Sequence, residues 1–189
     1  NSLILTENIS SDDLLLGDKN AVMVAARILA YGPEYKSEVV HPITGNKFTY
    51  EFNLADCPFK EIPELEKMES NNFEMTLPIS KQVITYKLLT GKEEKLIENE
   101  LKQIKKLGSE VTPDLTTRLR YVVTSVDGNT DKKTINLFVD NMLSRDSLAL
   151  RKELSLNSPD IELKQEIEIE GETVEVAIPM TVNFFWPTA

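Results

Sequence analysis

The feature that most constrains the fold is a change in the spacing of apolar residues along the chain. From residue 48 to residue 54 an apolar side chain occupies every second position, which is the pattern of a half-buried strand. Turn residues at 41–46 come before this run, so residues 38–40 are expected to pair with it. The alternation returns at 161–178 around the turn Glu170-Gly171-Glu172. The sequence therefore predicts an antiparallel hairpin towards each end of the chain.

Between these hairpins the apolar spacing becomes helical. Residues 92–107 carry an apolar stripe at the helical period, have two glutamates in the first turn and are followed by Gly108. Further helices are expected at 112–126, starting at Thr112-Pro113, at 132–141, and at 144–154 with Ser144 as the cap. Strands are expected at 73–77 and 82–89, and a loop with at most one helical turn at 58–72.

The helix predicted at 18–31 differs from the others because it is apolar on nearly all sides. Asp18 is its expected N-cap, and Gly32-Pro33 ends it. Such a helix is expected to form the centre of a core. Arg27 is its one interior charge, and it needs either a partner or an exit to solvent.

These segregated runs of strands and helices predict an α+β fold, with a helical core and two small antiparallel β-hairpin regions. A length of 189 residues suits one domain or two small ones. We expect a single α+β domain over 1–189. A subdivision into 1–90, with the first helix and a β region, and 91–189, with the helical middle and the last hairpin, stays open.

Charge and composition exclude several classes of partner. A net charge of -10 repels polyphosphate, so we expect no nucleic-acid partner. No apolar run approaches the roughly 20 residues of a membrane span, so no membrane association is expected. Cys57 is the only cysteine, which excludes an internal disulfide and a cysteine-rich zinc site. The chain begins at Asn1 rather than Met, so a removed N-terminal segment stays open.

No catalytic motif is present. His41 is the only histidine, so a cysteine–histidine centre would need it together with Cys57, which flanks the same predicted strand. We interpret His41 instead as a solvated loop residue. Residues 127–131 are a fragment of a calcium loop and are predicted to form a turn, and Asn8-Ile9-Ser10 fits a glycosylation sequon. The sequence thus predicts no catalytic residue, no cofactor, no metal ligand and no small-molecule substrate.

Residues 184–187 are three consecutive aromatic residues and a proline. Phe184, Phe185 and Trp186 cannot all face one core if the segment is a strand, because neighbouring side chains point to opposite faces. The segment then either folds back over its own core or contacts a partner. We take Phe184, Phe185, Trp186 and Pro187 as the candidate partner-binding residues, with Trp186 as the anchor.

Several segments, taken in order, resemble the baseplate hub and assembly protein family of T-even-type, contractile-tailed bacteriophages. The resemblance extends from about Leu14 to the end of the chain. It is carried by Gly17-Asp18-Lys19-Asn20-Ala21-Val22, Ala26-Arg27-Ile28, Tyr31-Gly32-Pro33-Glu34-Tyr35, the strand 83–89 with Thr90-Gly91-Lys92-Glu93-Glu94, residues 141–147 with Leu150-Arg151, and Ile178-Pro179 with Phe184-Phe185-Trp186-Pro187.

In that family the two hairpin turns often carry C-x-x-C pairs, as in a zinc ribbon. Here the turns read His41-Pro42-Ile43-Thr44-Gly45 and Glu170-Gly171, so they are degenerate zinc-ribbon-like turns without thiolates. If the ribbon persists, strand packing alone must hold it.

The resemblance implies a structural subunit in the hub region of a tail baseplate that binds neighbouring tail proteins. The implied location is the virion, after synthesis and assembly in the host cytoplasm. The alternative is a transient hub assembly factor that is absent from the mature particle. A third class, a cell-wall hydrolase, would need two converging carboxylates, and the sequence offers no such pair.

Overall fold

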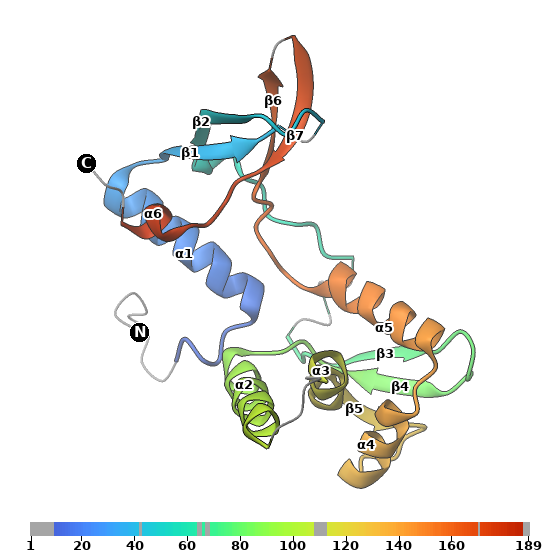
Figure 1. The fold of residues 1–189 in the computed structure, drawn as a ribbon. Coiled ribbons are helices and arrows are strands. Elements are labelled where there is room, and N and C mark those ends of the chain that lie inside the picture. The colour runs from blue at the N-terminus through green and yellow to red at the C-terminus, as the bar shows by residue number, and fades with distance from the viewer. Residues whose placement is uncertain are drawn as a thin grey trace. The chain divides into compact units, whose positions relative to one another are not determined.

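The structure is a computed structural model that describes residues 10–41, 43–63, 66, 69–107, 113–169 and 171–186 (Figure 1). Helices and small antiparallel sheets alternate along the chain, which confirms the predicted α+β class. In chain order the elements are α1 (Leu16–Tyr31), β1 (Glu34–Val40), β2 (Lys47–Asn53), the 3-10 helix η1 (Leu54–Asp56), β3 (Phe73–Thr76), β4 (Val83–Tyr86), α2 (Gly91–Lys106), α3 (Asp114–Val122), β5 (Val123–Val126), α4 (Lys132–Asp140), α5 (Ser144–Asn157), β6 (Lys164–Ile169), β7 (Glu172–Ala177) and α6 (Val182–Phe185).

The chain divides into two compact units, and each unit combines two separate segments. Unit 1 contains residues 1–16 and 61–158, and unit 2 contains 17–60 and 159–189. This grouping differs from a subdivision at residue 90, because unit 1 takes residues from both sides of that position. The single α+β domain over 1–189 stays a prediction.

Unit 1 is built on a three-stranded antiparallel sheet in the order β3-β4-β5. The predicted strand pair is present, and its Phe73 and Tyr86 stack with ring centroids 5.3 Å apart. Helices α2 to α5 belong to the same unit. The buried core of unit 1 consists of Phe73, Leu77, Ile84, Tyr86, Leu88, Leu119, Val122, Val123, Val126, Ile135, Val139 and Leu150.

The third strand of this sheet was not predicted. The helix expected at 112–126 is wrong beyond Val122, because residues 123–126 form β5 and pair with β4. The run Val-Val-Thr-Ser-Val is rich in β-branched residues, which fit a pleated strand better than a helix. Thr112 lies outside the described residues, and Pro113 is the N-cap of α3 without a side-chain hydrogen bond.

The other helices of unit 1 lie close to their predicted positions. Helix α2 begins after Thr90 with a capping box, in which Glu93 reaches back to the backbone of the cap. Helix α4 is capped by Asp131, whose carboxylate accepts the backbone N–H of Thr134. The predicted cap of α5 is wrong, because Ser144 is already helical and Leu143 occupies the N-cap position. Gly108 lies outside the described residues.

Unit 2 contains both predicted hairpins. β1 pairs with β2 from Glu34↔Asn53 to Val40↔Lys47, and β6 pairs with β7 from Lys164↔Ala177 to Ile169↔Glu172. The zinc-ribbon detail stays a prediction, and Pro42 and Glu170 in the two turns lie outside the described residues. The buried core of unit 2 consists of Val24, Tyr35, Val39, Phe52, Leu54, Cys57, Ile161, Ile167, Val174, Val176, Ile178 and Phe184.

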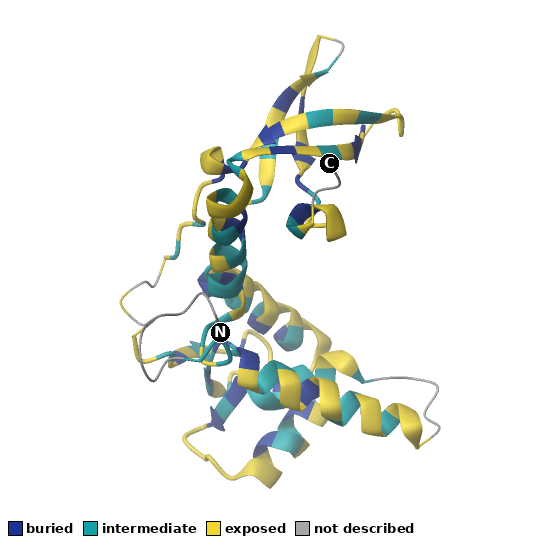
Figure 2. Ribbon diagram, turned by 90° about the vertical axis from the view of Figure 1, so that its left-hand side faces the viewer, coloured by how far each residue is buried: buried dark blue, intermediate teal, exposed yellow. Residues whose placement is uncertain are grey.

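Helix α1 is not buried on nearly all sides, so that prediction is wrong. Only Gly17, Val24 and Arg27 are buried, and Leu29 is 87% exposed (Figure 2). Much of the apolar pattern is alanine, which covers little surface, so one narrow stripe is enough to pack the helix. Position 17 must be glycine, because any Cβ there would lie 1.5 Å from the carbonyl oxygen of Pro159.

Arg27 has the partner that the sequence demanded. Its guanidinium donates to the carbonyl oxygens of Gly32 at 3.1 Å and Glu34 at 3.4 Å. It also lies over the ring of Tyr31, 4.8 Å from the centroid. Both terminal nitrogens of the guanidinium are therefore partnered inside unit 2, while its buried Nε makes no hydrogen bond among the described residues. Among the described residues, no helix is both long enough and apolar enough to cross a bilayer.

Candidate partner-binding surface

The aromatic segment at the end of the chain forms a short helix rather than a strand. Helix α6 places Phe184 in the core of unit 2, where it is fully buried and meets Tyr35 edge-on with centroids 5.0 Å apart. The assumption that neighbouring side chains alternate between two faces is therefore wrong for this segment. A helical turn rotates each side chain by about 100°, so three neighbours point in three directions.

The three aromatic residues pass from the core to the surface. Phe185 is half-buried and packs on Phe184 with centroids 5.0 Å apart. The ring centroids of Phe185 and Trp186 lie 6.1 Å apart, and Trp186 is 69% exposed. Pro187 lies outside the described residues. One aromatic residue thus folds back over the core of its own unit, while the indole faces outward, and its contact with a partner stays a prediction.

Helix α6 is held firmly to strand β1. The hydroxyl of Tyr35 donates to the carbonyl oxygen of Pro179 at 2.9 Å and lies 3.4 Å from the hydroxyl oxygen of Thr181. The backbone N–H of Phe184 donates to the carbonyl oxygen of Thr181 at 3.0 Å, which closes the first turn. Trp186 therefore projects from a segment that these hydrogen bonds join to β1.

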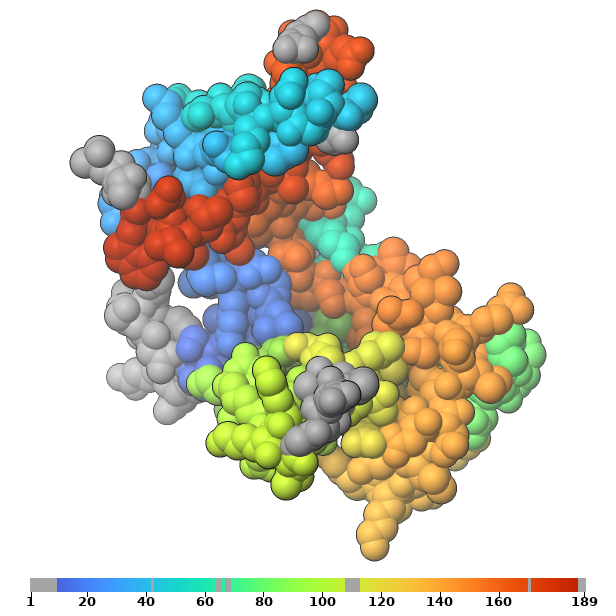
Figure 3. All heavy atoms as spheres, in the orientation of Figure 1, coloured from blue at the N-terminus to red at the C-terminus, as the bar shows by residue number. Residues whose placement is uncertain are grey.

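A groove runs beside β1 next to this segment. One hollow of about 500 Å³ lies between β1 and the start of α6, and a second of about 300 Å³ lies between β1 and the end of β7. Glu38 lines both hollows, and the two together are called the groove. Figure 3 shows the red residues of α6 and the segment before it lying along the blue residues of β1. The first hollow is lined by Lys36, Ser37, Glu38, Thr49, Thr181, Val182 and Asn183.

His41 and Cys57 each make structural contacts, and their partners are different groups. The prediction that His41 is solvated is wrong, because the residue is only 5% exposed. Its Nδ1 accepts the backbone N–H groups of Ile43 at 3.2 Å and Thr44 at 3.3 Å, which fixes the turn of the first hairpin. Cys57 is buried, and burial raises the pKa of its thiol. A thiol kept neutral is a poor nucleophile.

The acidic segment at 127–131 is a turn, as predicted. Asp127 adopts φ +48° and accepts the backbone N–H of Val83 at 2.9 Å, while Asp131 caps α4. These carboxylates are therefore engaged by the protein's own backbone. Within the part of the chain that the structure describes, no group of three or more His, Cys, Asp or Glu residues is arranged to hold a metal ion.

One buried carboxylate that orders unit 1 carries no signal in the sequence pattern. Asp146, on α5, is 1% exposed and accepts the backbone N–H groups of Ile79 at 2.7 Å and Ser80 at 3.0 Å. Burial raises the pKa of this carboxyl, but the hydrogen bonds outweigh burial and the pKa is lowered. The side chain ties the β3–β4 turn to α5. No local signal marks this contact, because Asp146 is separated from Ile79 by 67 positions and from Ser80 by 66.

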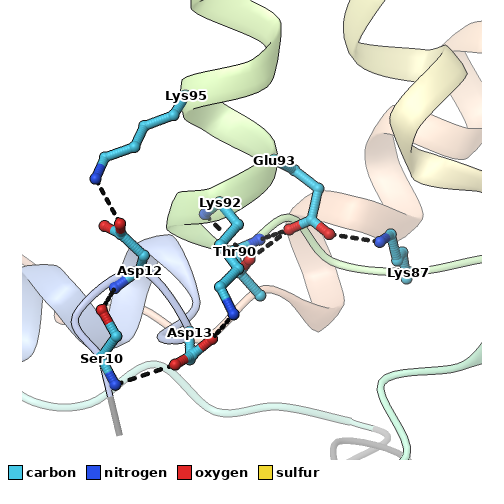
Figure 4. Close-up of polar contacts among 8 residues, drawn as sticks. All are labelled: Ser10, Asp12, Asp13, Lys87, Thr90, Lys92, Glu93 and Lys95. Atoms are coloured by element: carbon cyan, nitrogen blue, oxygen red, sulfur yellow. Dashed lines mark hydrogen bonds and ion pairs between the residues drawn. The ribbon is translucent and has the colours of Figure 1, made fainter.

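Glu93 is the second engaged carboxylate, and it lies in a polar cluster at the start of α2 (Figure 4). It accepts from Lys87 Nζ at 2.6 Å, from the backbone N–H of Thr90 at 2.9 Å and from the Thr90 hydroxyl. Burial raises the pKa of this carboxyl, but these hydrogen bonds outweigh burial and lower the pKa to about 2. The T-x-x-E spacing is a capping box that the sequence displays.

The same cluster fixes the segment at 10–15 to α2. Lys92 pairs with Asp13, and Lys95 pairs with Asp12 at 2.5 Å (Figure 4). The backbone N–H of Gly91 donates to the carbonyl oxygen of Leu14 at 3.1 Å. The charged groups of this cluster neutralise one another within unit 1, which indicates a structural role rather than a binding site for a charged ligand.

Comparison with known proteins identifies the family. A family model described as "T4 bacteriophage base plate protein" matches residues 2–186 of this chain. No curated protein and no solved structure gives a match. The family match covers almost the entire sequence and confirms the resemblance to a T4-type baseplate protein family. The chain therefore belongs to the family of T4 bacteriophage base plate proteins.

Proposed function

We propose that this protein is a structural subunit in the hub region of a phage tail baseplate and that it binds neighbouring tail proteins through the surface around Trp186. Family membership supports a structural role in the baseplate and a location in the virion tail. A baseplate subunit must present fixed surfaces to its neighbours, and it needs no reaction centre. The carboxylates of Asp146 and Glu93 each accept hydrogen bonds from the protein's own backbone, which indicates a structural role for both.

The exposure of Trp186 is the observation that carries this proposal. An indole that is 69% exposed leaves a large apolar surface in water, and its burial by a partner is favourable. The support beneath it is already ordered, because Phe184 is buried and Tyr35 ties β1 to the segment before α6. Binding would therefore cost little conformational entropy. Tryptophan anchors in such positions typically contribute about 2 kcal/mol or more.

The direct test compares Trp186→Ala with Phe59→Ala. Both residues are exposed aromatics of unit 2, Phe59 to 74%, but Phe59 lies in the loop after η1, away from α6 in the sequence. We expect Trp186→Ala to melt within a few degrees of wild type and to be incorporated into tails at a tenth or less of the wild-type level. Phe59→Ala should be incorporated normally. Equal incorporation of the two variants would remove the docking role of Trp186.

Mass spectrometry of purified tails tests the structural-subunit proposal itself. We expect the protein in mature particles at a fixed ratio to a known hub protein. Its absence from mature tails, together with its presence in assembly intermediates, would instead identify a transient hub assembly factor.

A further inference from the structure

Strand β1 presents an open edge to the groove described above. Among the described strands, β1 pairs only with β2. The backbone N–H of Leu54 donates to Pro33 O, and that of His41 donates to Asn46 O, so the odd-numbered residues of β1 form the hydrogen-bonded pairs. The N–H and C=O groups of the even-numbered residues therefore point away from β2. This edge consists of Glu34, Lys36, Glu38 and Val40.

Part of this edge is already closed by the protein itself. The outward carbonyl oxygen of Glu34 accepts from Arg27 at 3.4 Å. The edge open to another chain therefore extends from Lys36 to Val40, which is the stretch that lines the two hollows. An extended strand lies about 4.8 Å from its neighbour, and unprotected edges of this kind accept additional strands.

The walls of the groove restrict what can enter it. Thr181, Val182 and Asn183 form the wall opposite Lys36 and Glu38. At the other end, Val40 faces Ala177 and Pro179, which gives that end an apolar lining. An extended chain beside this edge can form backbone hydrogen bonds at Lys36, Glu38 and Val40 in turn.

The charges near the groove indicate the chemistry of the occupant. Glu38 and Glu175 line the apolar end, and each pairs with one lysine on its own hairpin, Lys47 at 2.8 Å and Lys164 at 2.9 Å. These pairs are exposed and contribute little, so a lysine or arginine of a partner can compete for the carboxylates. The segment 159–186 carries a single base, Lys164, and seven acids, which are Asp160, Glu162, Glu166, Glu168, Glu170, Glu172 and Glu175.

We propose that an extended, basic segment of a neighbouring tail protein adds to the outer edge of β1 as a third strand of that sheet. An apolar side chain of this segment covers Val40 and Ala177, and a lysine or arginine meets Glu38 or Glu175. This inference rests on the proposed function and specifies the partner's chemistry. A second copy of the chain is disfavoured as the occupant, because two copies of net charge -10 repel each other.

Proline substitution tests the edge directly. Glu38→Pro removes an outward N–H without removing a hydrogen bond between β1 and β2, which is where edge strands accept proline. Glu51→Pro is the matched control, because it lies opposite Lys36 and also points its N–H outward, but from the far edge of the hairpin. Each substitution also removes one exposed ion pair, Glu38–Lys47 or Glu51–Lys36.

We expect Glu38→Pro to reduce incorporation into tails at least tenfold relative to Glu51→Pro when the two melt at similar temperatures. If Glu38→Pro melts at a lower temperature than Glu51→Pro, the pair Glu38→Lys and Glu51→Lys tests the same edge through charge. We then expect Glu38→Lys to be incorporated into tails at least fivefold less than Glu51→Lys. Incorporation of the Glu38 and Glu51 variants at equal levels would overturn the proposal, as would conversion of a dimer to a monomer by Glu38→Pro.

A photoreactive amino acid at Val182, in the groove wall, identifies the occupant. We expect it to capture a lysine- or arginine-rich, proline-free peptide of another tail protein, either in tails or in assembly intermediates. Capture of an acidic peptide, or of none, would overturn the inference. If wild-type protein is absent from mature tails, the structural-subunit proposal fails, while cross-linking in intermediates still decides whether β1 accepts a strand.

Discussion

Replacing Glu93 with glutamine should remove a pH-dependent part of the stability of unit 1. The carboxylate is 18% exposed and accepts hydrogen bonds from Lys87 and Thr90, which lower its pKa from the usual 4.5 to about 2. That difference corresponds to about 3 kcal/mol of unfolding free energy at neutral pH. Because Lys87 is 32% exposed, screening by water lowers the expected value to about 2 kcal/mol.

The sign of the pH dependence follows from the lowered pKa. Above pH 4.5 the carboxylate is ionised in both the folded and the unfolded chain, so its full contribution is present. As the pH falls from 4.5 towards 2, the unfolded chain binds a proton first and the contribution disappears. The difference in unfolding free energy between wild type and Glu93→Gln should therefore be about 2 kcal/mol at pH 7 and near zero at pH 2.

Urea unfolding followed by far-ultraviolet circular dichroism measures this difference. The helical signal reports mainly on unit 1, which contains α2 to α5, whereas the only tryptophan, Trp186, lies in unit 2. Measurements at pH 7, 3.5 and 2.5 avoid the low solubility expected near the isoelectric point of about 4.7.

Glu98→Gln is the control on the same helix, because Glu98 is 60% exposed and pairs with Lys102 at 3.3 Å. It should cost less than about 0.5 kcal/mol at any pH. If the difference in unfolding free energy between wild type and Glu93→Gln stays constant from pH 7 to pH 2.5, the assigned role of the Glu93 carboxylate is refuted.

Four further outcomes are expected. Phe184→Ala should destabilise unit 2 by about 3–5 kcal/mol in urea unfolding followed by Trp186 fluorescence, since the ring is fully buried, and a loss below about 1 kcal/mol would contradict its place in the core. Val24→Asp, at a position 1% exposed, should cost several kcal/mol by burying an unpaired charge, so a soluble variant with near-wild-type melting would show that α1 is peripheral. Asp146→Asn should lower stability by about 1–3 kcal/mol, because its charged hydrogen bonds to Ile79 and Ser80 are weakened, and calorimetry showing no change would count against that role. Elemental analysis should find no zinc, since the hairpin turns lack the four N or S ligands that a structural site needs, and about one zinc per chain would refute this.

Local patterns predicted the elements whose signals are contained in a few residues. The period of two at 48–54 and at 161–178, each beside turn residues, gave both hairpins in unit 2. The apolar stripe at 92–107 and the two glutamates at its start gave the beginning of α2 to within one residue. These signals act between neighbours in the sequence, so they can be read without knowing the tertiary contacts.

Properties that depend on distant residues could not be predicted in the same way. The valines at 122–126 continue the apolar stripe of the preceding helix. Their β-branched side chains favour a strand, and pairing with β4 fixes that outcome. The burial of α1 was overestimated because alanine is apolar without covering much area. At the candidate surface, the sequence indicated that the aromatic segment was unusual. Only the packing of Phe184 against Tyr35 shows that Trp186 is the residue left outside.

The two-segment construction of unit 2 has a consequence for synthesis on the ribosome. Its first segment, 17–60, is translated before the roughly 100 residues of 61–158, and its second segment follows only then. At about 5–20 residues per second, α1 and the first hairpin wait on the order of 5–20 s for Ile167, Val176 and Phe184. Unit 1 is almost complete by that time. The nascent chain therefore carries half of an apolar core without its cover until residues 159–184 have been made, and we expect that interval to be when it most needs a chaperone.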